Sequence, residues 1–150
     1  MPRVSRSRVI GVDQGRVWDL VSDPHNLPRW WPRAKRVEDV RGPIGARAHW
    51  TTVLETEAGK GVRADYRCTG ATAPQRYEWE QQIEGTPFER VLRAARLEIG
   101  LSEADSGTAV TLTSIESLRG ISRLGSMMMR GAARDRLEEA LASIERVLVE

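Results

Sequence analysis

The chain has 150 residues, of which 40% are apolar and 29% charged, a composition typical of a globular protein rather than a disordered one. Its 23 Lys and Arg residues stand against 21 Asp and Glu residues, and the arginines are scattered among carboxylates, so we expect no nucleic-acid partner. No run of 18 apolar residues occurs, and residues 1–12 lack the pattern of a secretory leader, so we expect no stable membrane insertion.

The cysteine and histidine content limits the chemistry that the chain can support. Cys68 is the only cysteine, which excludes an internal disulfide, and a cytoplasmic location is the simplest expectation. The two histidines, His25 and His49, are too few to build a Cys/His metal cluster, so we expect no metal site. The sequence contains no GxGxxG, GxxxxGK[ST] or HExxH motif, and we therefore expect no cofactor.

The first part of the chain is predicted to contain one strand and two short helices. Residues 2–12 form the predicted strand, and Asp13 can cap a short helix whose apolar face lies within residues 17–21. A second short helix is predicted over residues 23–31, because it begins with Asp-Pro, a favourable cap followed by a favourable first position, and Pro32 ends it.

Residues 36–118 are predicted to form six strands, which are separated by turn signals rich in glycine and proline. These signals lie at residues 42–45, 58–61, 69–74, 84–87 and 105–107. Because the connections are short, we expect neighbouring strands to be antiparallel. A long helix is predicted over residues 122–149, where apolar residues recur at helical spacing from Leu137 to Leu148.

The predicted strands alternate with a period of two, which indicates a sheet with one face on a core and one face in water. The predicted inner positions are Trp50, Thr52, Leu54, Val62, Ala64, Tyr66, Cys68, Tyr77, Trp79, Gln81 and Ile83. The outer positions carry charges such as Arg76 and Glu78, which we interpret as cross-strand pairs on a solvated surface. The long amphipathic helix is the expected cover for the inner face.

Three segments give this order of elements a family resemblance. Residues 9–23 (VIGVDQGRVWDLVSD) resemble a strand that runs into an "ap-x-x-V-W" helix and a "S/T-D" step. Residues 27–32 (LPRWWP) resemble a "P-x-W-x-P" segment, and residues 107–111 (GTAVT) resemble a "G-G-T-x-V-T" strand start. The chain is therefore similar, over nearly its whole length, to the polyketide cyclase/dehydrase and lipid-transport branch of the START-like (SRPBCC) superfamily. It departs from the family at Gln14, where proline is frequent.

The resemblance implies an α+β helix-grip fold in one domain spanning residues 1–150. In that fold a seven-stranded curved antiparallel sheet, two short helices and a long C-terminal helix enclose a cavity. The family includes aromatase/cyclases, lipid carriers and hormone or quinone binders, so the fold alone does not identify the function.

The predicted inner face supplies most of the candidate ligand-binding residues. Tryptophan and tyrosine suit such a cavity because each buries a large ring and offers a polar group that can orient a ligand. The candidates are Trp30, Trp50, Tyr66, Tyr77, Trp79, Gln81, Arg93, Met127 and Met128. For Trp50 and Trp79, filling the core is an equally open alternative.

Arg93 is the most informative single candidate. In the predicted sixth strand it shares the inner-face phase with Val91 and Leu97, which places it roughly opposite Trp79. It would then receive a carboxylate, phenolate or enolate oxygen of the ligand, pair internally with Glu116, or extend its head group to water.

Met127, Met128 and Met129 stand together near the start of the predicted long helix. Three consecutive helical positions cover most of the circumference, so at least one should face the sheet. Their flexible side chains suit either a varied ligand or an irregular core.

The leading hypothesis is a carrier or sequestering protein for a small hydrophobic molecule, which would be aromatic, polyketide-like or lipid-like. The alternative is an aromatase/cyclase or dehydratase-type enzyme, in which Arg93 or Tyr66 polarises a carbonyl and Glu116 transfers protons. A third hypothesis is regulation of a partner through a surface near Trp30 and Trp31. A homodimer is left open.

Overall fold

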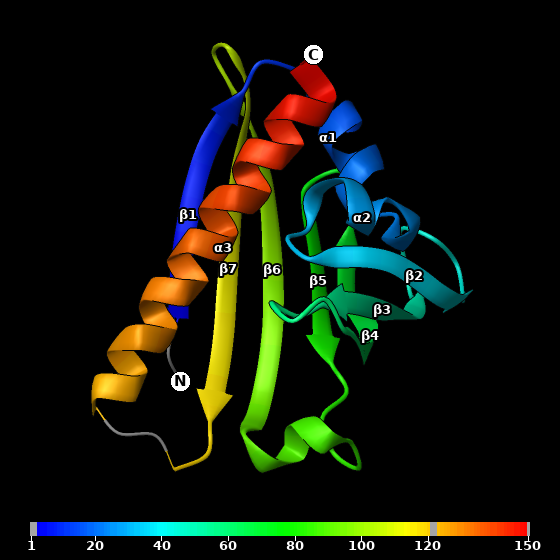
Figure 1. Ribbon diagram of the computed structural model, residues 1–150. Helices are drawn as coiled ribbons and strands as arrows, with labels where there is room; N and C mark the ends of the chain where they lie inside the picture. The colour runs from blue at the N-terminus through cyan, green and yellow to red at the C-terminus, as the bar shows by residue number, and fades with distance from the viewer. Residues whose placement is uncertain (1–2, 121–122, 150) are drawn as a thin grey trace.

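The computed structural model describes residues 3–120 and 123–149. Figure 1 shows a curved sheet crossed by a long C-terminal helix, with short helices at one end. The elements are β1 (Arg3–Ile10), α1 (Gln14–Val21), the 3-10 helix η1 (Pro24–Asn26), α2 (Leu27–Trp30), β2 (Ala34–Arg41), β3 (His49–Glu55), β4 (Gly61–Thr72), β5 (Arg76–Gln81), the 3-10 helix η2 (Pro87–Arg90), β6 (Leu92–Ala104), β7 (Gly107–Leu118) and α3 (Arg123–Val149). This order agrees with the predicted strand, two helices, six strands and long helix.

The seven strands form one antiparallel sheet in the order β1-β7-β6-β5-β4-β3-β2. Figure 1 shows that β2 and β3 run at a steep angle to β6 and β7, so the sheet curls around its inner face. Because β1 and β2 are the two edge strands, the segment with α1 and α2 must pass from one edge to the other. It does so beside α3, which contacts both helices.

The long helix α3 covers the sheet with the stripe that its spacing predicted. Leu137, Leu141 and Ile144 are fully buried, and α3 contacts β1 and β7. Residues three and four apart share one face of a helix, so this stripe is continuous along the second half of α3. The core therefore lies between the second half of α3 and the upper part of the curved sheet (Figure 1).

The start of the second helical segment agrees with its predicted cap. The Asp23 carboxylate accepts a hydrogen bond of 3.0 Å from the backbone N–H of His25, and Pro24 occupies the first position. The helical segment is divided into η1 and α2, and the chain becomes extended at Trp31. Asp13 occupies the N-cap position of α1, but its side chain makes no capping hydrogen bond, which corrects that detail of the prediction.

The outer face of the sheet carries the predicted cross-strand charge pairs. Glu78 in β5 lies opposite Glu98 in β6, and Arg76 and Arg96 bridge these two carboxylates at 2.8 to 3.3 Å. The hydrogen bond from Arg76 holds the pKa of Glu78 below its ordinary value. This charge lattice faces away from the core, so the chemistry of the inner face must come from other residues.

Candidate functional site

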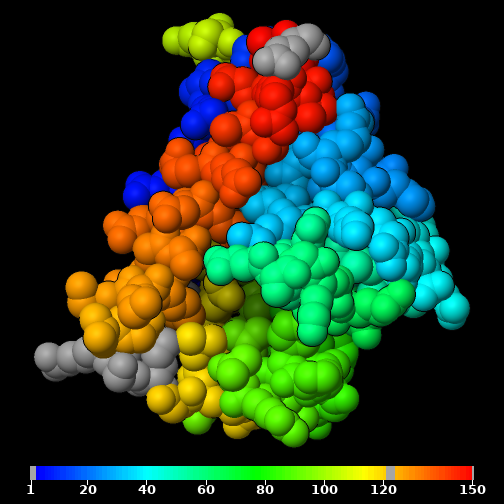
Figure 2. All heavy atoms as spheres, in the orientation of Figure 1, coloured from blue at the N-terminus to red at the C-terminus, as the bar shows by residue number. Residues whose placement is uncertain are grey.

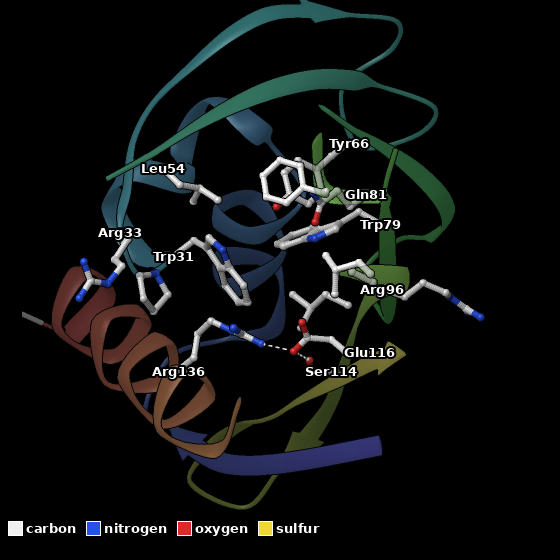
Figure 3. A pocket seen from close by; sticks show the side chains of 15 residues that line it. Trp31, Arg33, Leu54, Tyr66, Trp79, Gln81, Arg96, Ser114, Glu116 and Arg136 are labelled. Carbon is white, nitrogen blue, oxygen red and sulfur yellow. Dashed lines mark hydrogen bonds and ion pairs between the residues drawn. The ribbon is translucent and has the colours of Figure 1, made fainter. Parts of the chain in front are cut away.

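A cavity of about 280 Å³ lies on the inner face, beside the middle of α3, which contributes Arg136. In Figure 2 it appears as a hollow between α3, the β3–β4 hairpin and the segment around η2. The apolar part of its wall consists of Trp31, Leu54, Trp79, Phe88, Leu92 and Leu97. Tyr66, Gln81, Ser114, Glu116 and Arg136 supply polar groups to the same cavity (Figure 3).

The aromatic wall is built around Trp79 of β5, which is 4% exposed. Its ring centroid lies 5.5 Å from that of Trp31, and the two rings are nearly perpendicular. Four further rings surround it at 5.9 to 6.4 Å: those of Trp30, Trp50, Tyr66 and Tyr77. Edge-to-face contacts of this kind stabilise aromatic clusters beyond the area that they bury. Trp31 and Trp79 thus form a rigid apolar surface at the cavity.

The polar part of the cavity is built around Glu116 of β7. Its carboxylate accepts hydrogen bonds from Arg136 Nη2 at 2.5 Å and from Ser114 Oγ at 3.3 Å (Figure 3). The Arg136 guanidinium carbon also lies 6.0 Å from the ring centroid of Trp31. The two charged side chains are 34% and 20% exposed, so the pair is partly shielded from water. Each charge compensates the other inside the cavity wall.

Two nitrogen atoms of this polar part are buried without a hydrogen-bond partner among the residues that the structure describes. They are Nε2 of Gln81 and Nε of Arg136. Leaving a buried donor unpaired costs about 1–3 kcal/mol, and most buried polar groups in native proteins do have a partner. Both side chains line the cavity, although these two nitrogen atoms are themselves shielded from solvent.

The Tyr66 hydroxyl keeps its proton at neutral pH. Burial raises the pKa of Tyr66 to about 12 and outweighs the nearby Arg136 charge, which acts in the opposite direction. A neutral phenol donates a hydrogen bond to a carbonyl oxygen but does not act as a base.

The predicted placement of Arg93 is wrong. The β6–β7 register shifts between Leu92 and Ala94, so one extra residue enters β6 and the inward phase changes there. Leu92 is buried and lines the cavity, whereas Arg93 is exposed. Trp79 lies opposite Leu97 instead, so the expected contact between Arg93 and Trp79 does not occur.

The expected pair between Arg93 and Glu116 is also wrong, because Arg136 of α3 pairs with Glu116. Sequence reasoning missed Arg136, although a signal was present. It lies three residues after Ala133 and four before Ala140, both buried, and so shares their side of α3.

The predicted positions of Met127 and Met128 are also corrected. Both side chains are 69% exposed and do not pack against the sheet. Met129 is the methionine that faces the sheet, where it lies near Ser114 and Glu116 around a smaller pocket.

The other predicted ligand-binding residues divide into two groups. Tyr66, Trp79 and Gln81 line the cavity, as does the catalytic candidate Glu116. Trp30, Trp50 and Tyr77 are buried behind this wall, at most 2% exposed, and do not line the cavity. The indole N–H of Trp50 donates a 3.0 Å hydrogen bond to Thr52 Oγ1, which fixes it as part of the core.

The histidines lie outside the cavity. His25 is exposed and contacts the Asp23 carboxylate at 2.8 Å, and His49 is exposed on β3. Within the described residues, no three His, Cys, Asp or Glu side chains are placed to hold a metal ion together. No helix within residues 3–120 and 123–149 combines the length and apolar character that a membrane span requires.

Comparison with known proteins identifies the family. The family model described as "Polyketide cyclase / dehydrase and lipid transport" matches residues 1–149, and the chain belongs to this family within the START-like (SRPBCC) superfamily. No curated protein matches the chain.

Solved structures show the same helix-grip fold at low sequence identity. A protein from Nitrosomonas europaea has a TM-score of 0.74 and 16% identity, with 97% of this chain and 93% of that chain covered. The di-domain ARO/CYC BexL from the BE-7585A biosynthetic pathway has a TM-score of 0.78 and 13% identity, covering 97% and 49%. The di-domain ARO/CYC StfQ from the steffimycin biosynthetic pathway has a TM-score of 0.79 and 8% identity, covering 96% and 50%. The predicted α+β helix-grip fold is confirmed.

Proposed function

We propose that the protein binds a small, mostly apolar molecule, aromatic or lipid-like, in this cavity and acts as its carrier or sequestering protein. The supporting observation is the cavity wall itself, in which Trp31, Trp79 and Leu97 surround a limited set of polar groups. Ligand sites usually combine such an apolar wall with a few polar groups that fix orientation. At about 280 Å³ the cavity is near the lower end of the usual range for ligand sites, roughly 300–1,000 Å³, which favours a compact ligand over a long chain.

A second candidate function is that of an aromatase/cyclase-type enzyme. It is favoured by the position of a protonated phenol, Tyr66, and a carboxylate, Glu116, on one cavity. Tyr66 would polarise a carbonyl and Glu116 would accept a proton. Binding without turnover is the preferred function, because Arg136 and Ser114 both hydrogen-bond to Glu116 and tie its carboxylate to the cavity wall.

Native mass spectrometry of the protein isolated from its own host tests the binding proposal. We expect a stoichiometric complex that releases one aromatic or lipid-like molecule. Protein that is empty on isolation and stays empty with a panel of polyketides, fatty acids and quinones would contradict the proposal.

The same released molecule distinguishes carrier from enzyme. Incubation with the protein, followed by chromatography and mass spectrometry, should leave it unchanged if the protein is a carrier. If a product forms, Tyr66→Phe and Glu116→Gln should each lower its rate about a hundredfold or more, the usual contribution of an acid or base.

A further inference from the structure

Exposed apolar side chains gather at the end of the molecule where α3 begins. Leu124, Met127 and Met128 are 67%, 69% and 69% exposed, and their spacing of three and four residues places them on one face of the first turns of α3. Val91, which directly precedes β6, is 57% exposed. Figure 1 shows that the start of α3, the end of β7 and η2 all lie at this lower end. Neighbouring exposed apolar groups usually mark a surface that binds a partner.

Arginines without an ion pair accompany these apolar side chains. Residues 117–134 contain four arginines and no carboxylate, whereas the rest of the chain has 19 basic against 21 acidic residues. Arg119 at the end of β7 donates a 3.0 Å backbone hydrogen bond to the Val91 carbonyl, so the two segments are adjacent. The exposed arginines of this end that form no ion pair within the described residues are Arg90, Arg93, Arg119, Arg130 and Arg134. They outnumber Glu89 and Asp135, the exposed carboxylates beside them in the sequence.

This combination of positive charge and flexible apolar side chains suits the surface of an anionic lipid bilayer. Arginines attract anionic headgroups, and leucine and methionine side chains enter the boundary between headgroups and acyl chains without a pocket of fixed shape. A second copy of the chain would bring arginines against arginines, which is unfavourable. Residues 117–134 also contain no aromatic side chain, whereas a protein partner is usually anchored by tryptophan or tyrosine.

We infer that this surface, formed by residues 90–93, Arg119 and residues 124–134, docks on an anionic lipid bilayer. Leu124, Met127 and Met128 lie at the headgroup boundary in the docked protein, and the arginines contact the headgroups. The contact is peripheral, because the second half of α3 stays packed against the sheet through Leu141. The inference goes beyond the proposed ligand binding and does not depend on it, so failure of either one leaves the other standing.

Co-flotation with lipid vesicles tests the docking. One set of vesicles contains phosphatidylcholine alone, and the other contains phosphatidylcholine mixed with phosphatidylglycerol. We expect the protein to bind the anionic vesicles at least about tenfold more tightly than the neutral ones, and to lose this preference as salt screens the arginines. Absence of binding to the anionic vesicles at low salt, or equal binding to both compositions, would overturn the inference.

Two double variants locate the contact on α3. Arg130→Gln/Arg134→Gln should lower the affinity for anionic vesicles about tenfold or more, because each arginine near the bilayer contributes to the attraction. Met127→Gln/Met128→Gln should lower it by a similar factor, because polar side chains do not enter the apolar boundary. All four side chains are exposed, so both variants should keep the circular dichroism spectrum of the wild type.

Matched controls come from the connection between β2 and β3. Arg41→Gln/Arg47→Gln removes two exposed arginines that form no ion pair within the described residues, and Ile44→Gln removes an apolar side chain that is 45% exposed. Both controls should bind anionic vesicles as the wild type does. Equal losses in the control variants and in the α3 variants would show that the assigned surface is wrong. Binding to poly-L-glutamate but to neither kind of vesicle would overturn the lipid partner in favour of an acidic protein.

Discussion

At the residue scale, the Arg136–Glu116 ion pair is a partly buried contact whose loss should affect stability. It joins α3 to β7 across the cavity wall, with Ser114 as a second donor to the carboxylate. Pairs on open surfaces contribute little, whereas breaking a fully buried pair is expensive. With 34% and 20% of their side chains exposed, Arg136 and Glu116 lie between these limits.

We therefore expect Arg136→Met and Glu116→Gln each to lower the free energy of unfolding by about 1–2 kcal/mol. The double variant should lose less than the sum of the two, because the second change removes a charge that the first left unpaired. Urea unfolding of the four proteins measures this coupling. The exposed pair Arg6–Glu138 is the matched control, and its coupling should be under about 0.5 kcal/mol. Additive losses at Arg136 and Glu116 would show that they do not interact.

The raised pKa of Tyr66 makes stability depend on pH in the alkaline range. Its pKa is about 12 in the folded protein, against 10.0 for an ordinary tyrosine. Between these values the unfolded chain releases the proton while the folded protein keeps it, so the free energy of unfolding falls as pH rises. Below pH 10 the contribution is fully present.

We expect Tyr66 to account for a loss of roughly 1–2 kcal/mol across this interval. Burial also raises the pKa of Tyr77, which adds a change of the same sign. Unfolding measured from pH 8 to pH 12 should therefore show a decline that Tyr66→Phe makes smaller but does not abolish. A slope identical in the wild type and in Tyr66→Phe would contradict this assignment.

At the element scale, the junction of β1 with the β6–β7 turn depends on Gly107. Its φ is +145°, and a Cβ atom there would lie 2.0 Å from the carbonyl oxygen of Ile10. We expect Gly107→Ala to lower the free energy of unfolding by more than about 2 kcal/mol. The backbone strain of an alanine at this φ and the steric clash of its Cβ with the Ile10 carbonyl oxygen both contribute. Gly100→Ala in the same hairpin is the control, since nothing lies within 4 Å of its Cβ position, and it should be neutral or slightly stabilising. Thermal unfolding of both variants makes the comparison.

The strands and helices could be predicted from the sequence because their signals are periodic and repeated. Alternation with a period of two identified the inner positions of β3, β4 and β5, and spacings of three and four identified the buried stripe of α3. Each periodic pattern is formed by several residues, so one residue that departs from the pattern does not change the predicted element.

The candidate site could be predicted only in part. It depends on the positions of single residues, whereas a strand or helix is indicated by many residues together. Tyr66, Trp79 and Gln81 lie at the cavity because the phase of β4 and β5 runs unbroken through them. Arg93 does not, because a bulge moves the phase of β6 by one residue and leaves no mark in the local sequence. Arg136 was missed because its charge suggested the solvated side of α3, although its spacing placed it beside the buried stripe.

At the scale of the whole molecule, the two halves of α3 differ in how much of their surface is buried. The second half is packed against the sheet, with Leu141 fully buried, whereas the first half exposes Met127 and Met128, and Arg136 at the middle of the helix lines the cavity. We expect the double variant Met127→Gln/Met128→Gln to change the free energy of unfolding by less than about 0.5 kcal/mol, because both side chains are exposed. Leu141→Ala should cost about 2–5 kcal/mol, and denaturant unfolding compares the two. A large loss of unfolding free energy in the methionine double variant would show that these two side chains make stabilising contacts.

The aromatic cluster also makes tryptophan fluorescence a signal of what the cavity contains. Trp31 and Trp79 line the cavity, and Trp30 and Trp50 lie within 6 Å of Trp79, close enough for excitation to pass among the indoles. Trp18 joins the same group through Tyr77. A ligand that quenches Trp31 should therefore quench the fluorescence of most of the protein's tryptophans at the same time. Packed rings held at fixed angles should also give a strong near-ultraviolet circular dichroism band, so that the protein reports its own occupancy without any label.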